Sequence, residues 1–518
     1  MSITRRRFLN RLCATSAKAI VANGVCTRLA LAELWGTRSA GPGLASKLAN
    51  DPLRPQFHLM PAANWMNDPN GPIFYKGRYH MFFQYNPNGA FWGTMHWAHA
   101  TSPDMIHWQH ETVAMAPTPE GYDRDGVFSG SAVLDRGTPT MIYTGVLPPA
   151  KPEDATLRDG MHTWREVQCL AVSHNDELLT WEKRPEPIIA RPPEGLKVNG
   201  FRDPCLWREG DEWMMGLGSG FDGKGAVLLY SSRDLRNWTY LHPLIEGDGP
   251  GKKAANPVDS GEMWECPDFF ALGEKHVLMY ATMGFVFWKV GTYKERRFHP
   301  EKEGTVDYGA YYAAKTMLDR DGKRILWGWI PERRPESEHK AAGWAGAMAL
   351  PRELSIAKDG SLRIEPAKAC EMLRGDWEQV GEGVGTVKGT AALRVHNLAT
   401  ELEIQFYAAA NQEFGFALQS EKGEKFAEVA FEPGNKDREL RINRTAVPFP
   451  LLTGSVVKLR MLVDGSVIEL FVNGSTAITE RVYKVPSGPL RVVMQKSENL
   501  RSIKLYQMKP ISRDRLTT

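Results

Sequence analysis

The chain has 518 residues, 42% hydrophobic and 24% charged, which is enough for two soluble globular domains. Its 64 Lys and Arg residues nearly balance 61 Asp and Glu residues, so the formal net charge is only +3 and favours neither nucleic acid nor an anionic surface as a partner. Six Cys in a chain of this length exclude a fold that depends on disulfides.

The first 50 residues are predicted to be an export signal followed by a linker. Residues 4–10 (TRRRFLN) resemble a twin-arginine signal, and a mildly apolar stretch follows over residues 12–34. Lys18 and Arg28 interrupt this stretch, which makes it a poor membrane span, and we predict no span elsewhere. We expect export to the periplasm or the cell exterior; the alternative is a basic tail on a cytosolic protein.

Residues 51–366 contain short β-type runs separated by turn residues. Examples are residues 79–85, 226–230 and 276–280, and no helical periodicity accompanies them. A motif also recurs, as SPDMIHW at residues 102–108, SRDLRNW at 232–238 and, more loosely, SHNDELLTW at 173–181. Each copy resembles a turn that carries an Asp and is closed by a Trp. Such repeats in an all-β chain favour propeller blades over chance recurrence.

Residues 367–518 have a different pattern. Hydrophobic and polar residues alternate at residues 401–406 and 466–472, which is typical of strands with one buried face. Asp464-Gly465 and Asn473-Gly474 flank the second run and are strong hairpin signals. We therefore expect a C-terminal β-sandwich after the propeller.

Three acidic motifs stand out, at residues 64–71 (NWMNDPNG), 200–204 (GFRDP) and 263–268 (MWECPD). Taken alone, each motif has a structural interpretation: the first as a turn, the second as a surface ion pair, and the third as an exposed charge at the end of a strand. Loops of a propeller converge at one end of its axis, however. Asp68, Asp203 and Glu265 are therefore predicted to share one pocket.

Paired carboxylates suit the cleavage of glycosides, in which one protonates the leaving oxygen and the other attacks or activates water. The acid needs a raised pKa, and Trp264 and Cys266 would help by drying the surroundings of Glu265. Asp68 lies beside Asn67 in an amide-rich segment, and hydrogen bonds there would keep it ionised.

With these blocks the chain resembles glycoside hydrolase family 32, the invertases, levanases and exo-inulinases, from about residue 57 to its C-terminus. The resemblance implies a five-bladed β-propeller followed by a β-sandwich. It implies Asp68 as nucleophile, Glu265 as general acid/base and Asp203 as the residue that holds fructose hydroxyls and stabilises the transition state. The implied reaction is the release of terminal, non-reducing β-D-fructofuranosyl residues from sucrose, levan or inulin, by double displacement with retention.

The resemblance also implies a set of substrate-binding residues: Asn67, Gln84, Trp92, Phe128, Ser129, Arg202 and Trp329. Phe128 stands where many plant members have Trp, and Val133 where they have Thr, so the choice between sucrose and fructans stays open. Residues 147–164 are charged and begin with prolines, and we expect them to form a loop at the rim of the pocket.

Three alternatives remain: a fructosyltransferase that uses the same site, another propeller glycosidase with inversion, and a non-catalytic carbohydrate-binding propeller.

His96 and His99 would face opposite sides of a strand, so we assign them a structural role. No metal or phosphate-binding motif is present, and we expect no metal and no cofactor. Nothing in the sequence specifies an oligomeric state, or whether a disulfide joins two of Cys169, Cys205, Cys266 and Cys370.

Overall fold

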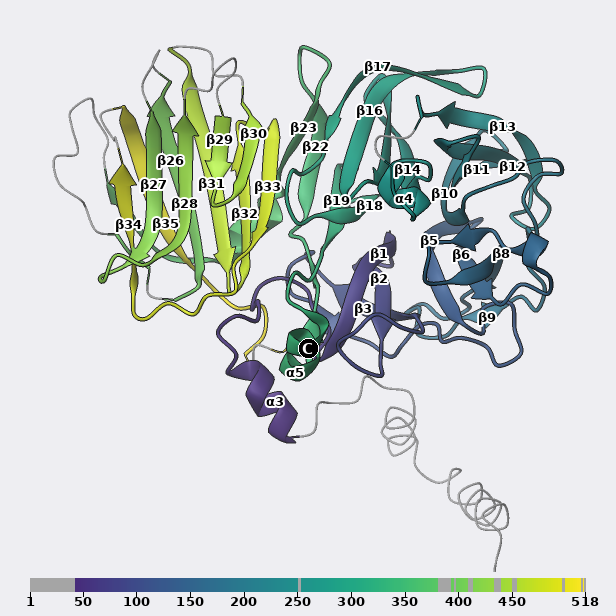
Figure 1. Ribbon diagram of the computed structural model, residues 1–518, viewed down its shortest axis with the longest axis horizontal. Helices are drawn as coiled ribbons and strands as arrows, with labels where there is room; N and C mark the ends of the chain where they lie inside the picture. The colour runs from purple at the N-terminus through teal and green to yellow at the C-terminus, as the bar shows by residue number, and fades with distance from the viewer. Residues whose placement is uncertain are drawn as a thin grey trace, which may run out of the picture.

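A computed structural model describes residues 42–249, 253–380, 393–395, 397–408, 413–432, 439–449, 454–495, 499–513 and 516. The expected export signal lies outside these residues. Two β-domains lie side by side (Figure 1), a five-bladed propeller and a sandwich, and the fold class expected from the sequence is confirmed.

Each blade is an antiparallel sheet. Blade 1 comprises β1 (Asn64–Tyr75), β2 (Arg78–Asn86), β3 (His96–Ser102) and β4 (Gln109–His110), with β20 (Trp344–Ala345) parallel to β1. Blade 2 comprises β5 (Gly126–Asp135), β6 (Thr138–Leu147) and β8 (Thr163–Val172), with β7 (Leu157–Arg158) and β9 (Glu182–Lys183) beside β8. Blade 3 comprises β10 (Phe201–Glu209), β11 (Glu212–Phe221), β12 (Lys224–Ser232) and β13 (Thr239–Glu246).

Blade 4 comprises β14 (Glu265–Leu272), β15 (Lys275–Thr282), β16 (Phe285–Lys294) and β17 (Arg297–Thr305). Blade 5 comprises β18 (Tyr312–Leu318), β19 (Arg324–Ile330), β22 (Arg352–Ile356) and β23 (Leu362–Pro366), with β21 (Ala347–Met348) beside β19. One sandwich sheet has the order β24 (Arg374–Val380), β35 (Leu500–Met508), β26 (Ala399–Tyr407), β31 (Val456–Asp464), β32 (Val467–Val472) and β33 (Thr476–Arg481). The other has the order β25 (Arg394–Val395), β34 (Leu490–Gln495), β27 (Phe414–Ser420), β28 (Lys425–Glu432), β29 (Glu439–Ile442) and β30 (Thr445–Pro448).

The five innermost strands close a ring around the propeller axis. Strand β1 contacts β5 and β18, β10 contacts β5 and β14, and β14 contacts β18. Every one of these strands has a register shift against its neighbour, between Met66 and Pro69, Val127 and Gly130, Arg202 and Cys205, Glu265 and Asp268, and Tyr312 and Lys315. A bulge of this kind bends a strand and redirects a side chain.

The recurring motif forms the connection between the third and fourth strands of blades 1 to 3. Asp104 accepts hydrogen bonds from two backbone amides of its own turn, Asp234 does the same, and Asn175 takes the equivalent place in the looser copy. The predicted turn with an Asp is therefore confirmed in two copies, whereas in the third the residue that accepts the backbone amide is an Asn. The residues that close the three turns are Trp108, Trp181 and Trp238.

The strands predicted from alternation and β-propensity are present. The runs named above fall within β2, β12, β15, β26 and β32, except that Ser466 lies in the turn before β32. Gly465 lies between β31 and β32 with a positive φ, and Asn473 and Gly474 turn the chain from β32 to β33 with φ of 55° and 67°. Both hairpin predictions are confirmed.

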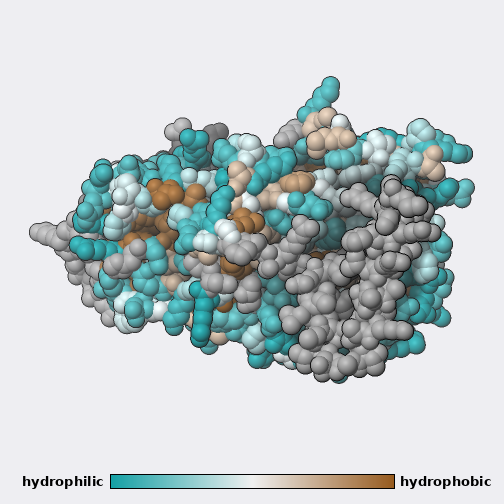
Figure 2. Space-filling view, turned by 90° about the horizontal axis from the view of Figure 1, so that it is seen from below, coloured by the Kyte–Doolittle hydropathy of each residue, from teal (hydrophilic) through white to brown (hydrophobic). Residues whose placement is uncertain are grey.

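The described helices are few and short: α3 (Pro42–Ala49), α4 (Pro257–Ser260), α5 (Glu336–Ala342) and the 3₁₀ turns η1 (Pro152–Asp154) and η2 (Lys368–Leu373). None of them is long and apolar enough to cross a membrane. The lower face of the molecule is largely hydrophilic in its described part, with small hydrophobic areas toward the sandwich (Figure 2).

Helix α3 occupies part of the segment that the sequence assigns to a linker. Leu48 is buried against the propeller, and Lys47 Nζ donates a hydrogen bond of 2.6 Å to Ala341 O in α5. The apolar residues of this short segment find a partner only in the tertiary structure, so local composition did not indicate the helix.

A buried cluster of charges joins the two domains. His58, which precedes blade 1, lies 2.8 Å from Asp464 and 3.0 Å from Glu469, and all three side chains are fully buried. Arg352 of blade 5 pairs with the same Glu469 at 2.6 Å and with Asp307 at 2.9 Å. The sandwich acids thus hold both the entry to the propeller and its last blade. Apolar side chains of β31–β33 also belong to one core cluster with blades 1, 4 and 5.

This cluster should make the junction sensitive to alkaline pH. Burial alone would lower the pKa of His58, but the hydrogen bonds with Asp464 and Glu469 outweigh it and raise the pKa from 6.5 to about 9. A group whose pKa rises on folding stabilises the fold below its unfolded pKa and loses that contribution as the pH rises through the folded value. We expect the stability advantage of the wild type over His58→Gln to shrink from pH 6.5 to pH 9, by on the order of 3 kcal/mol.

Unfolding measured at a series of pH values checks this prediction. His174→Gln is the matched control, because that side chain is 70% exposed and should leave the wild-type profile unchanged. Parallel profiles for the wild type and His58→Gln would contradict the assignment of a protonated His58 to the junction.

Candidate active site

One cavity of about 340 Å³ lies where the five inner strands begin. All ten residues singled out from the sequence line it: Asn67, Asp68, Gln84, Trp92, Phe128, Ser129, Arg202, Asp203, Glu265 and Trp329. The convergence expected for the three acidic motifs is therefore observed.

The carboxylates lie on strands, whereas the sequence suggests loops. Asp68 lies within β1, Asp203 within β10, and Glu265 is the first residue of β14. Each is at or beside the bulge of its strand, and Asp203 and Cys266 adopt positive φ angles of 63° and 47°. Left-handed backbone at such residues is costly and is found where a side chain must be aimed. Turn-forming residues such as Asn, Asp and Pro here mark strand bulges.

Asp68 lies at the bottom of the cavity. Its Oδ2 accepts a hydrogen bond of 2.7 Å from Ser129 Oγ, and its Oδ1 accepts one of 3.1 Å from Asn67 Nδ2. Trp65 Nε1 in turn donates to Asn67 Oδ1 at 2.8 Å and fixes that amide. The expected hydrogen bonds are present, but burial outweighs them and raises the pKa of Asp68 above its ordinary value.

Asp203 is joined to Asp68 through a buried thiol. Cys266 N donates to Asp203 Oδ2 at 2.9 Å, and Cys266 Sγ lies 3.6 Å from that oxygen and 3.5 Å from Asp68 Oδ2. Burial raises the pKa of Cys266 well above its usual range, so the sulfur remains a neutral donor. Burial also raises the pKa of Asp203 to about 7; the nearby Arg202 opposes this, and Glu265 and Asp68 add to it.

Both oxygens of Glu265 are held. Arg202 NH2 donates to Oε1 at 2.8 Å, and the Tyr312 hydroxyl donates to Oε2 at 2.7 Å. The carboxyl stays 23% exposed toward the cavity, where it can exchange a proton with a ligand. Trp264 does not shield Glu265 from water as expected, because its ring stacks on Tyr280 instead, with the ring centroids 3.8 Å apart.

Arg202 balances the negative charge of more than one carboxylate. Its NH1 donates to Glu166 Oε1 at 2.9 Å, while NH2 serves Glu265, and the side chain is only 6% exposed. Glu166 Oε2 accepts further hydrogen bonds from Phe201 N and Thr156 Oγ1. A planar guanidinium can satisfy two carboxylates at once in this way.

Aromatic rings form the outer walls. Trp92, 38% exposed, lies 6.3 Å from Phe128 and 5.9 Å from Trp164, and Trp329 lies opposite against Trp65 at 5.8 Å between centroids. The predicted rim loop is confirmed in its second half, since Leu157, Asp159, Met161, His162 and Trp164 all line the cavity, whereas residues 153–156 line a separate one.

A glycine sets the position of one wall. Gly346 has a φ of +78°, and a Cβ there would lie 2.2 Å from Met66 O and 2.8 Å from Trp329 Nε1. Only glycine lets the chain pass behind the strand that carries Asp68.

Sequence reasoning missed Glu166, Tyr312 and the role of Trp164. Tyr312 precedes a bulge like the other inner-strand residues, but no motif marks it. Glu166 and Trp164 alternate with Arg165 at the start of β8, a two-residue period that indicates a strand with two different faces.

The four cysteines whose pairing the sequence left open are all free and buried. Within the described residues, no group of three metal-binding side chains comes together.

Comparisons with known proteins agree over nearly the whole described chain. Residues 58–366 match the N-terminal domain model of glycosyl hydrolases family 32, and residues 371–507 match the C-terminal one. A sucrose-6-phosphate hydrolase and a raffinose invertase, both of Escherichia coli, are each 36% identical to this chain; they cover 83% of it and 90% and 89% of their own lengths. The crystal structure of fructan 1-exohydrolase IIa from Cichorium intybus superposes with a TM-score of 0.75 at 28% identity, covering 89% of this chain and 98% of that one.

The two domain models together span most of the chain, and the three carboxylate motifs lie at the bulges of inner strands around one cavity. The chain therefore belongs to glycoside hydrolase family 32 and is a glycosidase of the β-fructofuranosidase type.

Proposed function

We propose that the protein releases terminal β-D-fructofuranosyl residues from sucrose or fructans, with retention of configuration. The observation that carries this proposal is the division of the carboxylates at the cavity floor. Glu265 is held by the guanidinium of Arg202 and by the Tyr312 hydroxyl, whereas Asp68 is bound only by uncharged donors. Two carboxyl groups in such different environments suit an acid and a nucleophile.

In the first step, an Asp68 oxygen bonds to the anomeric carbon while the bond from that carbon to the leaving oxygen breaks. Glu265 gives its proton to the leaving oxygen. In the second step, water gives a proton to Glu265 and its oxygen bonds to the anomeric carbon, which releases Asp68 and fructose. Ser129 and Asn67 donate hydrogen bonds to Asp68 and would stabilise its negative charge when its bond to the anomeric carbon breaks.

The closed floor supports attack on the end of a chain. Gln84, Ser129 and Asp203 are each less than 4% exposed, so the deepest part of the cavity suits one sugar unit. Gln84 Oε1 is buried and accepts no hydrogen bond within the described protein, although its Nε2 donates to Val127 O.

We also propose export of the protein. Support comes from residues 4–10 (TRRRFLN) and the interrupted apolar stretch that follows, all outside the described residues. Detection of the processed protein outside the cytoplasm, and its retention inside after Arg5 and Arg6 are changed to Lys, would test this.

Product analysis tests the reaction. Purified protein supplied separately with sucrose, inulin and levan should release fructose as the first product, because the closed floor admits one terminal unit. In methanol–water mixtures, the methyl fructoside formed should keep the β configuration, because attack from Asp68 and then from methanol inverts the centre twice. Longer oligosaccharides would indicate transfer, and an α-methyl product would rule out double displacement.

Replacement of Asp68 by Asn should lower kcat by at least about 10³-fold, since the amide keeps the hydrogen-bonding shape but cannot form the glycosyl-enzyme bond. Circular dichroism and the melting temperature should stay close to those of the wild type. Asp176→Asn is the matched control, because this carboxylate is 67% exposed at the surface. Substantial turnover by Asp68→Asn would refute the assignment of the nucleophile.

A further inference from the structure

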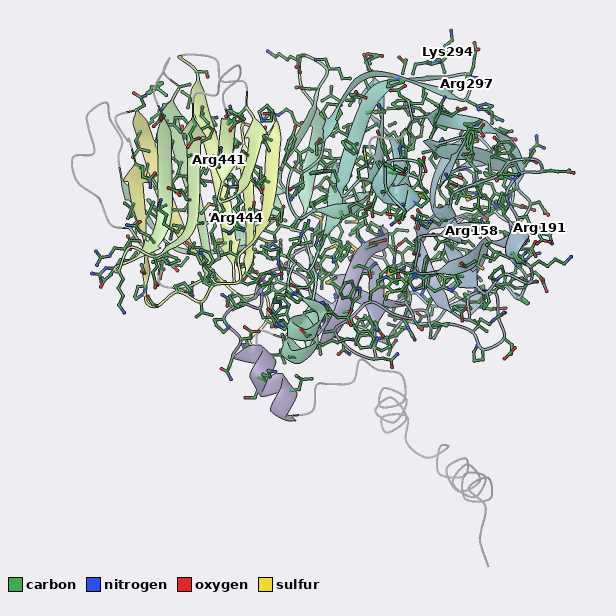
Figure 3. The ribbon with its side chains drawn as sticks, viewed as in Figure 1. Arg158, Arg191, Lys294, Arg297, Arg441 and Arg444 are labelled. Carbon is green, nitrogen blue, oxygen red and sulfur yellow. The ribbon has the colours of Figure 1, made fainter. Side chains whose placement is uncertain are left out.

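The hairpin that connects β7 to β8 has two chemically different faces. Leu157 pairs with Trp164, and both side chains line the catalytic cavity. Arg158 and Arg165 alternate with them and line a separate cavity of about 400 Å³, together with Arg191. Figure 3 shows Arg158 and Arg191 on this side of blade 2. The pleat therefore directs the aromatic face inward and the cationic face away from the substrate.

The inward face is held in a fixed shape. Asp159 Oδ1 accepts hydrogen bonds from Met161 N at 2.8 Å and from His162 N at 2.7 Å, which defines the turn. The His162 ring stacks on Trp164 with centroids 4.3 Å apart, and Phe128 meets the same indole edge-on at 5.7 Å. Held by His162 on one face and by the perpendicular ring of Phe128, Trp164 can present its remaining surface to a ligand at little entropic cost.

The hairpin is also tied to the catalytic carboxylates at its base. Thr156, next to β7, donates its hydroxyl to Glu166 Oε2, and Glu166 holds the same Arg202 that contacts Glu265. The wall is thus positioned by the network that positions the general acid.

The direction of the leaving group follows from the shape of the cavity. A fructosyl unit bonded to Asp68 occupies the closed floor, so the oxygen protonated by Glu265 and the sugar attached to it point to the mouth. The mouth is where Trp92, His162 and Trp164 stand, and Met161, at the tip of the hairpin, is 85% exposed.

The charges at this mouth do not suit a phosphate. Of the described residues that line the cavity, Arg202 alone carries a permanent positive charge, and both of its terminal nitrogens are engaged by carboxylates. Asp159 adds a negative charge at the rim; partial burial opposes its ionisation, but the hydrogen bonds from His162 and Met161 prevail and lower its pKa. A phosphorylated leaving sugar would therefore meet negative charge without a free cation.

We infer that the hairpin of residues 157–164 is the leaving-group wall, that Trp164 stacks on the ring of the leaving sugar, and that this wall selects an uncharged sugar over a phosphorylated one. The inference rests on the proposed fructosidase function. The substrate inferred for this chain therefore differs from the one named for a relative of 36% identity, a sucrose-6-phosphate hydrolase.

Three substrates separate the possibilities: sucrose, sucrose 6-phosphate, and methyl β-D-fructofuranoside, which has no leaving sugar ring. The wild type should prefer sucrose to sucrose 6-phosphate by at least about tenfold in kcat/KM. Trp164→Ala should lower kcat/KM for sucrose about tenfold, mainly through KM, yet change that for the methyl fructoside less than about twofold. Trp164→Phe should retain most of the activity on sucrose.

Two further variants complete the test. Met161→Lys places a cation at the mouth and should raise kcat/KM for sucrose 6-phosphate relative to sucrose several-fold. Trp377→Ala, which removes a 58% exposed Trp from the sandwich, should change no substrate preference.

Equal losses on sucrose and the methyl fructoside in Trp164→Ala would reduce Trp164 to a structural residue and overturn the inference. A wild-type preference for sucrose 6-phosphate would overturn the proposed charge selection. Failure of the wild type to cleave any of the three, or inulin or levan, would instead refute the proposed function itself.

Discussion

The whole site depends on how closely five strands can approach one axis. The inner strands contact each other in a ring, and each is interrupted by a bulge near its start. A regular strand would send alternate side chains into the neighbouring blades. The bulges instead redirect at least one polar side chain per blade toward the cavity, which is why residues as distant in sequence as Asp68 and Tyr312 act on one ligand.

Collecting carboxylates in this way has an electrostatic cost. Asp203, Glu265 and Glu166 surround a single guanidinium, and burial raises the pKa of Asp68 and Asp203. Burial therefore works against the ionised form of these two groups, although the attack proposed for Asp68 requires its carboxylate. Arg202 limits this effect by offering separate nitrogens to Glu166 and Glu265. A lysine could not match two carboxylates with the same fixed geometry.

The sequence was most informative where local chemistry is specific. Turn motifs such as residues 102–108 and hairpin signals such as Asn473-Gly474 give the same structure wherever they occur, and they predicted blade connections and sandwich turns correctly. The ten pocket residues followed from motifs and from a resemblance to a family. Their placement on bulged strands did not follow, because Asn-Asp-Pro-Asn-Gly favours a turn unless neighbouring blades impose a strand.

Long-range partnerships were harder to predict. Glu166 has no local motif, and its importance depends on Arg202, which lies 36 residues later. Desolvation of Asp68 is likewise a property of the assembled blades, so the hydrogen bonds expected from Asn67 gave the wrong direction for its pKa. Helix α3 is the same case on a larger scale, since its buried Leu48 packs against a part of the chain almost 300 residues away.

The buried charges at the junction also limit how such domains can be exchanged. Asp464 accepts three backbone amides of residues 56–58 in addition to the His58 ring, and Glu469 accepts Leu350 N beside Arg352. A propeller joined to a foreign sandwich without these two acids would carry a buried imidazolium without a counter-charge, and a guanidinium left with Asp307 alone, at a cost of several kcal/mol. An exchange of one domain without the other is therefore expected to destabilise the junction.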